Sequence, residues 1–142
     1  MNSVLVVDDE SPMRQILVRW LTAAGYDTSE AADANAALEA LTAKSADVVF
    51  CDVQMPGHDG LWLVGKLRER FPTVAIVLAT AVDTVPPAVS LQGGVVEYLV
   101  KPFVRDLVLA AVSRAVEWHQ AAVARGPQVP GESPVDRWLK DR

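Results

Sequence analysis

Residues 48–60 of the chain read Val-Val-Phe-Cys-Asp-Val-Gln-Met-Pro-Gly-His-Asp-Gly. The run at 48–51 is short and uniformly apolar, which is typical of a β-strand covered on both faces by helices. Asp52 follows this run directly, and Asp59 stands where it can cap a helix that begins at the next residue. The stretch therefore predicts a strand, an acidic loop and a helix in succession, as in a parallel α/β sheet.

Three more short runs rich in β-branched residues lie on either side, at residues 4–7, 74–79 and 95–100, and residues 28–31 are a weaker strand candidate. Segments with helical periodicity separate the runs. Such an alternation calls for parallel strands with helices on both faces of the sheet. We therefore predict the α/β class, with a doubly wound five-stranded parallel sheet flanked by five helices.

Capping residues and helix breakers set the expected bounds of the first three helices. Ser11 can cap the first helix with Pro12 at its first position, and Gly25 can end it. Asp33 and Asp59 can cap the second and third helices. The apolar stripes expected to face the core are Met13, Ile16, Leu17, Trp20, Leu21 and Ala24, then Leu38 and Leu41, then Leu61, Val64, Leu67 and Phe71.

The last two helical segments differ in length. Pro86 and Pro87 fit only a first turn, and two glycines soon follow, so a fourth helix between residues 83 and 94 must be short. The fifth helix is expected from about 104 to 125 and would be roughly 30 Å long. Its expected inward stripe is Leu107, Ala111, Ala115, Trp118 and Ala122.

Composition and charge bound the class of protein. The chain has 142 residues, of which 51% are hydrophobic, enough for one domain at 1–125, and the Pro- and Gly-rich residues 126–142 are expected to be a linker or tail. A net charge of −5 argues against direct binding to nucleic acid. Cys51 has no partner cysteine, no apolar run is long enough to span a bilayer, and no signal peptide is visible. We expect a soluble cytoplasmic domain without membrane contact.

Chemically active side chains gather at the ends of the predicted strands. Asp8 and Asp9 follow the first strand, Asp52 the third, Thr80 the fourth and Lys101 the fifth. In a parallel sheet the carboxyl ends of the strands share one edge, where ligands bind. Clustered carboxylates repel one another unless a cation offsets them, and Mg²⁺ suits such a pocket. The set offers a carboxylate nucleophile, a metal site, an ammonium group and a hydroxyl, which are the parts that phosphoryl transfer needs.

Four motifs together resemble the receiver domain of two-component response regulators, the CheY-like family. They are Val4-Leu-Val-Val-Asp-Asp-Glu10, Asp52-Val-Gln-Met-Pro-Gly-His-Asp-Gly60, Thr80-Ala81 and Glu97-Tyr-Leu-Val-Lys-Pro-Phe103. The resemblance covers about residues 1–125. It implies a flavodoxin-like three-layer sandwich with strand order 2-1-3-4-5.

The resemblance also implies the phosphorylation and metal sites. Asp52 would be the residue that accepts the phosphoryl group. Mg²⁺ would be held by Asp9, by Asp52 itself and by the backbone carbonyl of Gln54, with Asp8 in a supporting role.

Further residues would form the switch, again by resemblance. Lys101 would contact the phosphoryl group or, before phosphorylation, Asp52. Thr80 would be the switch hydroxyl, and Tyr98 the aromatic side chain whose rotamer follows it. The peptide bond between Lys101 and Pro102 would be cis.

The resemblance implies a signalling switch and not an enzyme, beyond self-catalysed phosphorylation and dephosphorylation. A sensor histidine kinase or a phosphotransfer protein would supply the phosphoryl group. The surface of the fourth helix, fifth strand and fifth helix would then change to control an output domain or a protein partner. The same two helices could form a homodimer.

Some residues depart from the family pattern. His58 stands where the family usually has an apolar residue, and we expect its imidazole to face solvent. Gln54 and Val82 lie beside the expected phosphoryl site and could tune hydrolysis of the acyl phosphate. Cys51 is expected to be a small core residue and not a redox centre.

Three alternatives compete with this interpretation. A phosphatase of the haloacid dehalogenase type would need a second aspartate two residues after Asp52, where this chain has Gln54. A flavin-binding protein would need a phosphate-binding loop after the first strand, where this chain is acidic. A receiver-like dimerisation or adaptor module that is not phosphorylated stays open.

Overall fold

The computed structural model of the chain describes residues 1–81 and 94–126. The strands in these residues are β1 (Ser3–Val7), β2 (Asp27–Ala31), β3 (Val48–Asp52), β4 (Ala75–Thr80) and β5 (Val95–Val100). The helices are α1 (Ser11–Ala23), α2 (Ala34–Ala43), α3 (Gly60–Arg70) and α5 (Arg105–Arg125). Each predicted strand is present, with bounds that differ from the prediction by at most one residue. The predicted fourth helix, with Pro86 and Pro87, and all of the predicted tail beyond residue 126 lie outside the described residues.

The five strands form one parallel sheet in the order β2-β1-β3-β4-β5, which confirms the expected topology. The register pairs Val7 with Cys51, and Asp52 with Ala79. The carboxyl ends of β1 and β3 therefore lie side by side at one edge of the sheet. The order reverses at β1, whose neighbours are β2 and β3, so the edge beside β1 and β3 is the topological switch point.

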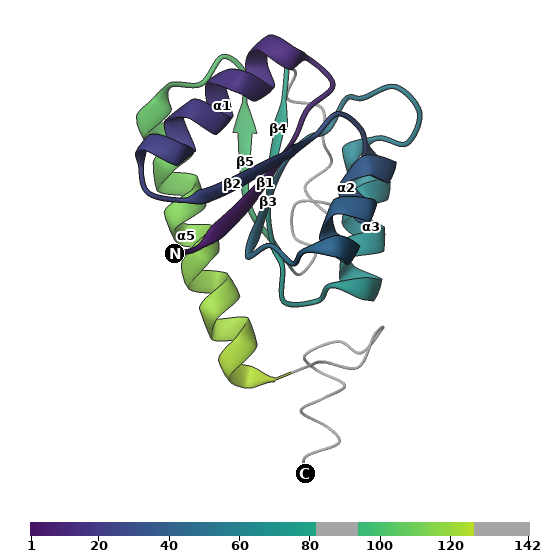
Figure 1. Cartoon of the computed structure of the whole chain (residues 1–142), viewed down its shortest axis with the longest axis vertical. Helices are drawn as coiled ribbons and strands as arrows, with labels where there is room; N and C mark the ends of the chain where they lie inside the picture. Colours follow the sequence, from purple (N-terminus) through teal and green to yellow (C-terminus); the bar gives the residue numbers. More distant parts are fainter. Residues whose placement is uncertain (82–93, 127–142) are drawn as a thin grey trace.

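Helices cover both faces of the sheet (Figure 1). Leu5 and Val7 of β1 belong to the core cluster under α2 and α3, whereas Val4 and Val6 belong to the cluster under α1 and α5. All four side chains are at most 1% exposed, because the strand is covered on both sides. The uniformly apolar strands of the sequence are thus explained by two cores that share one sheet.

The helix starts test the predicted caps. Asp33 and Asp59 cap α2 and α3 as predicted, since each carboxylate accepts a hydrogen bond from the backbone N–H of the third residue of its helix. The prediction for α1 was wrong by one residue. Its N-cap is Glu10, whose carbonyl accepts the first helical hydrogen bond from Arg14 N, while the Ser11 hydroxyl accepts one from the side chain of Gln15.

Two predicted stripes differ in phase from the buried faces. In α1 Leu17 and Leu21 are fully buried, but Ile16 is 37% exposed. In α5 Leu107 is 53% exposed and Val108 is buried in its place. Adjacent apolar residues lie about 100° apart on a helix, and only packing against the sheet decides which of them turns inward. None of the helices in the described parts of the chain is long and apolar enough to cross a membrane.

Candidate functional site

The predicted site residues meet at the carboxyl edge of the sheet. Asp8 and Asp9 lie between β1 and α1, and Asp52 is the last residue of β3. Thr80 is the last residue of β4, and Lys101 directly follows β5. The register of the sheet brings them together, because neighbouring parallel strands end at similar heights.

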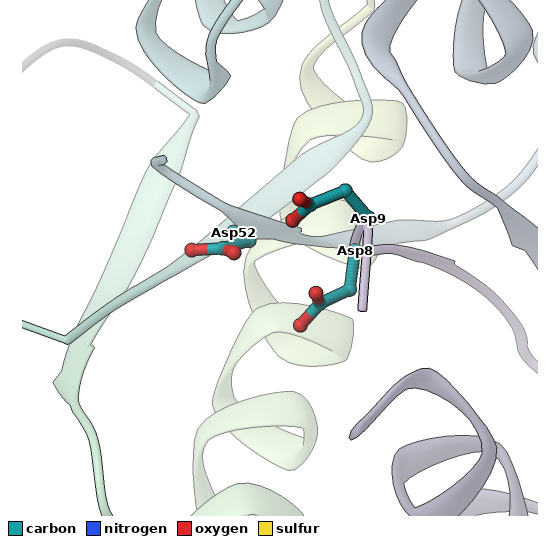
Figure 2. Close-up of side chains that lie close together, drawn as sticks. All are labelled: Asp8, Asp9 and Asp52. Carbon is teal, nitrogen blue, oxygen red and sulfur yellow. The ribbon is translucent and has the colours of Figure 1, made fainter. Parts of the chain in front are cut away.

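Three carboxylates form the centre of the site. Asp8, Asp9 and Asp52 each offer one oxygen, and these oxygens all lie within 4.8 Å of one another. Figure 2 shows the side chains of Asp8 and Asp9 projecting from one strand end toward the side where Asp52 lies. Asp8 and Asp52 are only 2% and 4% exposed, whereas Asp9 is exposed. A ligand could therefore approach from the side of Asp9.

Lys101 faces two of these carboxylates at once. Its Nζ lies 3.5 Å from Oδ2 of Asp8 and 3.5 Å from Oδ2 of Asp52. The contact with Asp52 is the pairing that the resemblance implies for the unphosphorylated state, and the contact with Asp8 is additional. The Lys101–Pro102 peptide bond is cis, which is the isomer that the resemblance implies.

The electrostatic environment of Asp52 disfavours its charge. Burial raises the pKa of the Asp52 carboxyl above its ordinary value, Lys101 lowers it, and the charge of Asp8 raises it further. A backbone hydrogen bond from Gln54 N to Oδ1 of Asp52, 3.3 Å long, also favours the charged form. The upward influences prevail, so the site gains from any further cation that approaches it.

The start of α3 packs closely against the carboxyl end of β3, at Asp52 and Val53. A Cβ atom placed on Gly60 would lie 2.5 Å from the carbonyl oxygen of Asp52 and 2.8 Å from Cα of Val53. Gly60 N also donates a hydrogen bond of 2.9 Å to the carbonyl of Val53. Sequence reasoning placed Gly60 within a motif but gave it no role, and the motif alone holds no signal for this contact.

The predicted switch residues lie on adjacent strands. Thr80 is fully buried, and its carbonyl accepts a 2.7 Å hydrogen bond from Lys101 N. Tyr98 of β5 is half-buried, pairs with Leu78 of β4 and packs against the core under α2 and α3. Their placement is compatible with a coupled movement, which remains a prediction. Val82 lies outside the described residues.

The structure shows the surroundings of two residues noted in the sequence, His58 and Cys51. His58 is exposed, as predicted, but its ring also stacks on Trp62 with centroids 3.7 Å apart and an angle of 8°. Cys51 is 1% exposed, and burial together with the nearby carboxylates raises the pKa of its thiol. Its Sγ donates to the carbonyl of Asp52 at 3.2 Å. Cys51 is a small core residue, as predicted, and its thiol stays protonated and unreactive.

The donor set fits Mg²⁺. The ion prefers oxygen ligands and is commonly held by one or two carboxylates, with waters and phosphate oxygens in its other positions. The three carboxylates here are met by a single ammonium group among the described residues, so the cluster holds surplus negative charge. Gln54 is exposed at the rim, and its backbone carbonyl as a ligand stays a prediction.

A model of the response regulator receiver domain matches residues 4–113 of the chain. The chain belongs to the response regulator receiver family. Receiver domains are signalling switches of two-component systems, and they generally bind Mg²⁺ at an acidic pocket such as the one formed by Asp8, Asp9 and Asp52.

Several relatives support this assignment. The DNA-binding transcriptional regulator NtrC of Klebsiella pneumoniae is 38% identical over 132 residues, which cover 92% of this chain and 27% of the relative. The C4-dicarboxylate transport transcriptional regulatory protein DctD of Rhizobium meliloti is 35% identical, with 97% of this chain and 33% of the relative covered. The chain thus spans only 27% and 33% of the length of these relatives.

Solved structures agree with the assignment. The receiver domain of NtrX from Brucella abortus has a TM-score of 0.74 at 32% identity and covers 80% of this chain and 98% of that chain. A CheY-like receiver domain protein from Methanospirillum hungatei has a TM-score of 0.80 at 20% identity, which supports the fold alone.

Proposed function

We propose that this receiver domain accepts a phosphoryl group on Asp52 from a sensor histidine kinase or a phosphotransfer protein, with Mg²⁺ bound beside it. The observation that carries the proposal is the environment of Asp52. Its buried carboxylate lies within 4.8 Å of two further carboxylates and 3.5 Å from the Lys101 ammonium group. This is a nucleophile with a metal site and a cation at its side.

The chain's own residues would act as follows. An oxygen of Asp52 forms the new bond to phosphorus, and the bond from phosphorus to the donor's imidazole nitrogen breaks, with its electron pair left on that nitrogen. Lys101, already turned toward Asp52, neutralises the charge on the phosphoryl oxygens. Asp9, Asp52 and the carbonyl of Gln54 would hold the metal, with Asp8 in support. When bound, Mg²⁺ offsets the mutual repulsion of the carboxylates and the incoming phosphate.

Phosphorylation would bias the domain between two states. The hydroxyl of Thr80 would gain a phosphoryl oxygen as a partner, and Tyr98 would turn inward behind it. The size of the population shift depends on how much better the phosphoryl group is bound in one state than in the other.

The surface that would respond includes β5 and the start of α5. Three apolar side chains are exposed there: Val100 (41%), Val104 (62%) and Leu107 (53%). Arg114 of α5 forms an ion pair with Glu97 of β5. Exposed apolar residues beside charged ones suit a protein partner or a second copy of the chain, so we propose a homodimer or an output partner here.

The output of the switch follows from the relatives by analogy. NtrC and DctD are named as transcriptional regulators, and this chain matches only a part of each. We propose that the domain controls an output domain or partner protein of that kind, without contacting nucleic acid through its own residues. Bacterial response regulators are generally cytoplasmic, and we propose the same compartment for this one.

Intact-mass spectrometry after incubation with acetyl phosphate and Mg²⁺ tests the proposal. The natural chain and a control variant, Asp27→Asn, should each gain one phosphoryl group, because Asp27 is a surface carboxylate on β2. Asp52→Asn should gain none. If the natural chain stays unmodified, the unphosphorylated adaptor becomes the better description. If Asp52→Asn is modified equally, another residue accepts the phosphoryl group and the assignment of Asp52 fails.

A further inference from the structure

The connection between β1 and α1 carries three consecutive carboxylates, on Asp8, Asp9 and Glu10. Two of them belong to the acidic cluster. Two hydrogen bonds hold the backbone N–H groups of Asp8 and Glu10. Asp8 N donates to the carbonyl of Ala31 at 3.2 Å, and Glu10 N donates to Oδ1 of Asp8 at 2.9 Å. Like charges on neighbouring residues tend to spread such a segment apart.

A cation from α1 reaches back over this connection. Nη1 of Arg14 donates a 2.7 Å hydrogen bond to the backbone carbonyl of Asp8, which is the carbonyl of the peptide that joins Asp8 to Asp9. Nε of Arg14 donates a 2.8 Å hydrogen bond to Oε1 of Glu30 in β2. The Arg14 side chain is only 15% exposed, whereas that of Glu30 is 46% exposed.

The two hydrogen bonds use different nitrogens of the guanidinium and link the Asp8 carbonyl to Glu30 on β2, the edge strand of the sheet. A planar guanidinium has donors in a fixed fork and can serve both acceptors at once, whereas a lysine ammonium on its flexible stem cannot reproduce that geometry. Glu30 is the fourth residue of β2, which pairs directly with β1, so the anchor point belongs to the sheet itself.

We propose that Arg14 is a positioning residue for the metal site: it holds the Asp8–Asp9 peptide so that both carboxylates face Asp52, and it thereby raises the affinity for Mg²⁺. The identity of the ion rests on the proposed function. The role of Arg14 rests on its two hydrogen bonds.

Charge and geometry make opposite predictions, which gives a sharp test. A positive charge beside the cluster repels Mg²⁺, so if charge alone mattered, removal of Arg14 would tighten binding. If positioning matters more, removal weakens binding. Loss of a group that orients metal ligands typically reduces affinity about 10- to 100-fold.

The experiment is isothermal titration calorimetry of the full chain with MgCl₂. Arg14→Met removes the charge and both hydrogen bonds, Arg14→Lys keeps the charge, and Glu30→Gln keeps an acceptor for Nε. Arg19→Met is the matched control, because Arg19 is an exposed arginine on the same helix.

We expect both Arg14 variants to bind Mg²⁺ about 10- to 100-fold more weakly than the natural chain. Glu30→Gln should weaken Mg²⁺ binding less. The dissociation constant of Arg19→Met should stay within a few-fold of that of the natural chain. Unchanged or tighter binding by Arg14→Met would overturn the proposal. A second result would also overturn it. If the metal-free Arg14 variants melt at a lower temperature but bind Mg²⁺ as tightly as the natural chain, the ion pair of Arg14 is purely structural. If Arg14→Met does not fold, Arg14→Lys and Glu30→Gln decide by the same criteria.

The calorimetry needs no phosphoryl donor, so the two proposals can fail separately. Suppose that Mg²⁺ binds to the natural chain, that Asp9→Asn abolishes this binding, and that Asp52 is never phosphorylated. The proposed function then fails, and the titrations of the Arg14 variants alone decide the role of Arg14. If the natural chain binds no Mg²⁺, the role of Arg14 is overturned.

Discussion

Replacement of Asp52 by asparagine removes one charge from a buried acidic cluster and should stabilise the metal-free chain at neutral pH. Asp52 is 4% exposed, and its Oδ2 lies 3.5 Å from Nζ of Lys101. At an effective dielectric constant near 20 this attraction amounts to about 5 kcal/mol, and the repulsion from each of the Asp8 and Asp9 oxygens within 4.8 Å to at least about 3 kcal/mol. The two repulsions together offset the attraction, so the cost of burying the carboxylate decides the balance.

Asparagine keeps the shape of the side chain and an acceptor for Gln54 N, and it loses only the extra strength of a charged hydrogen bond. We therefore expect Asp52→Asn to raise the free energy of unfolding by about 1–3 kcal/mol at pH 7.5 in the presence of EDTA.

The gain should disappear in acid. The pKa of Asp52 is raised in the folded state above its ordinary value of 3.8, so the folded chain holds this proton more tightly than the unfolded chain. The stability linked to that proton is fully present below pH 3.8 and is lost as the pH rises through the raised folded pKa. The natural chain and the variant should therefore converge as the pH falls toward 4.

Urea unfolding followed by circular dichroism at several pH values measures the effect. Asp27→Asn is the control, and it should change the stability by less than about 0.5 kcal/mol because Asp27 is partly exposed. An Asp52→Asn variant that is less stable than the natural chain at pH 7.5, or equally more stable at every pH, would refute the reasoning.

Other perturbations test the remaining contacts. Gly60→Ala should lower the free energy of unfolding by about 1–3 kcal/mol in thermal denaturation, because its Cβ would meet the Asp52 carbonyl at 2.5 Å; an unchanged melting temperature would contradict this. His119→Ala should cost about 1–2 kcal/mol in urea unfolding, since its Nε2 lies 3.1 Å from Oδ1 of Asp47; full stability would show that the contact contributes nothing. Mg²⁺ at 100 times its dissociation constant should stabilise the chain by about 2.7 kcal/mol, and Asp9→Asn should lose most of this effect; equal stabilisation of that variant would exclude Asp9 as a ligand.

The strands could be predicted because their signal is local. Runs such as residues 48–51 are apolar at every position, and a strand buried on both faces needs that pattern whatever its neighbours are. The caps of α2 and α3 were also local, since Asp33 and Asp59 accept hydrogen bonds from nearby backbone groups of their own helices. The cap of α1 was misplaced because N-cap preference favours Ser11 over Glu10, whereas the helix begins one residue earlier, with Ser11 as its first residue and no side-chain cap at Glu10.

Some packing details at the contacts between elements could not be predicted. The phase of α5 was wrong at Leu107 because its neighbour Val108 is equally apolar and the sheet selected Val108. No sequence pattern indicated the hydrogen bond from Arg14 to the Asp8 carbonyl or the narrow space at Gly60. Each arises where a helix packs against the end of a strand.

The sequence by itself determined which residues could carry the chemistry, since Asp8, Asp9, Asp52, Thr80 and Lys101 each stand at the end of a predicted strand. Only the tertiary structure decided how they share the site. It buries Asp8 and Asp52 but leaves Asp9 exposed, and it places the Lys101 ammonium group at equal distances from the two buried carboxylates. The physical reason is that burial and charge pairing depend on distances across strands, which the order of residues along the chain does not specify.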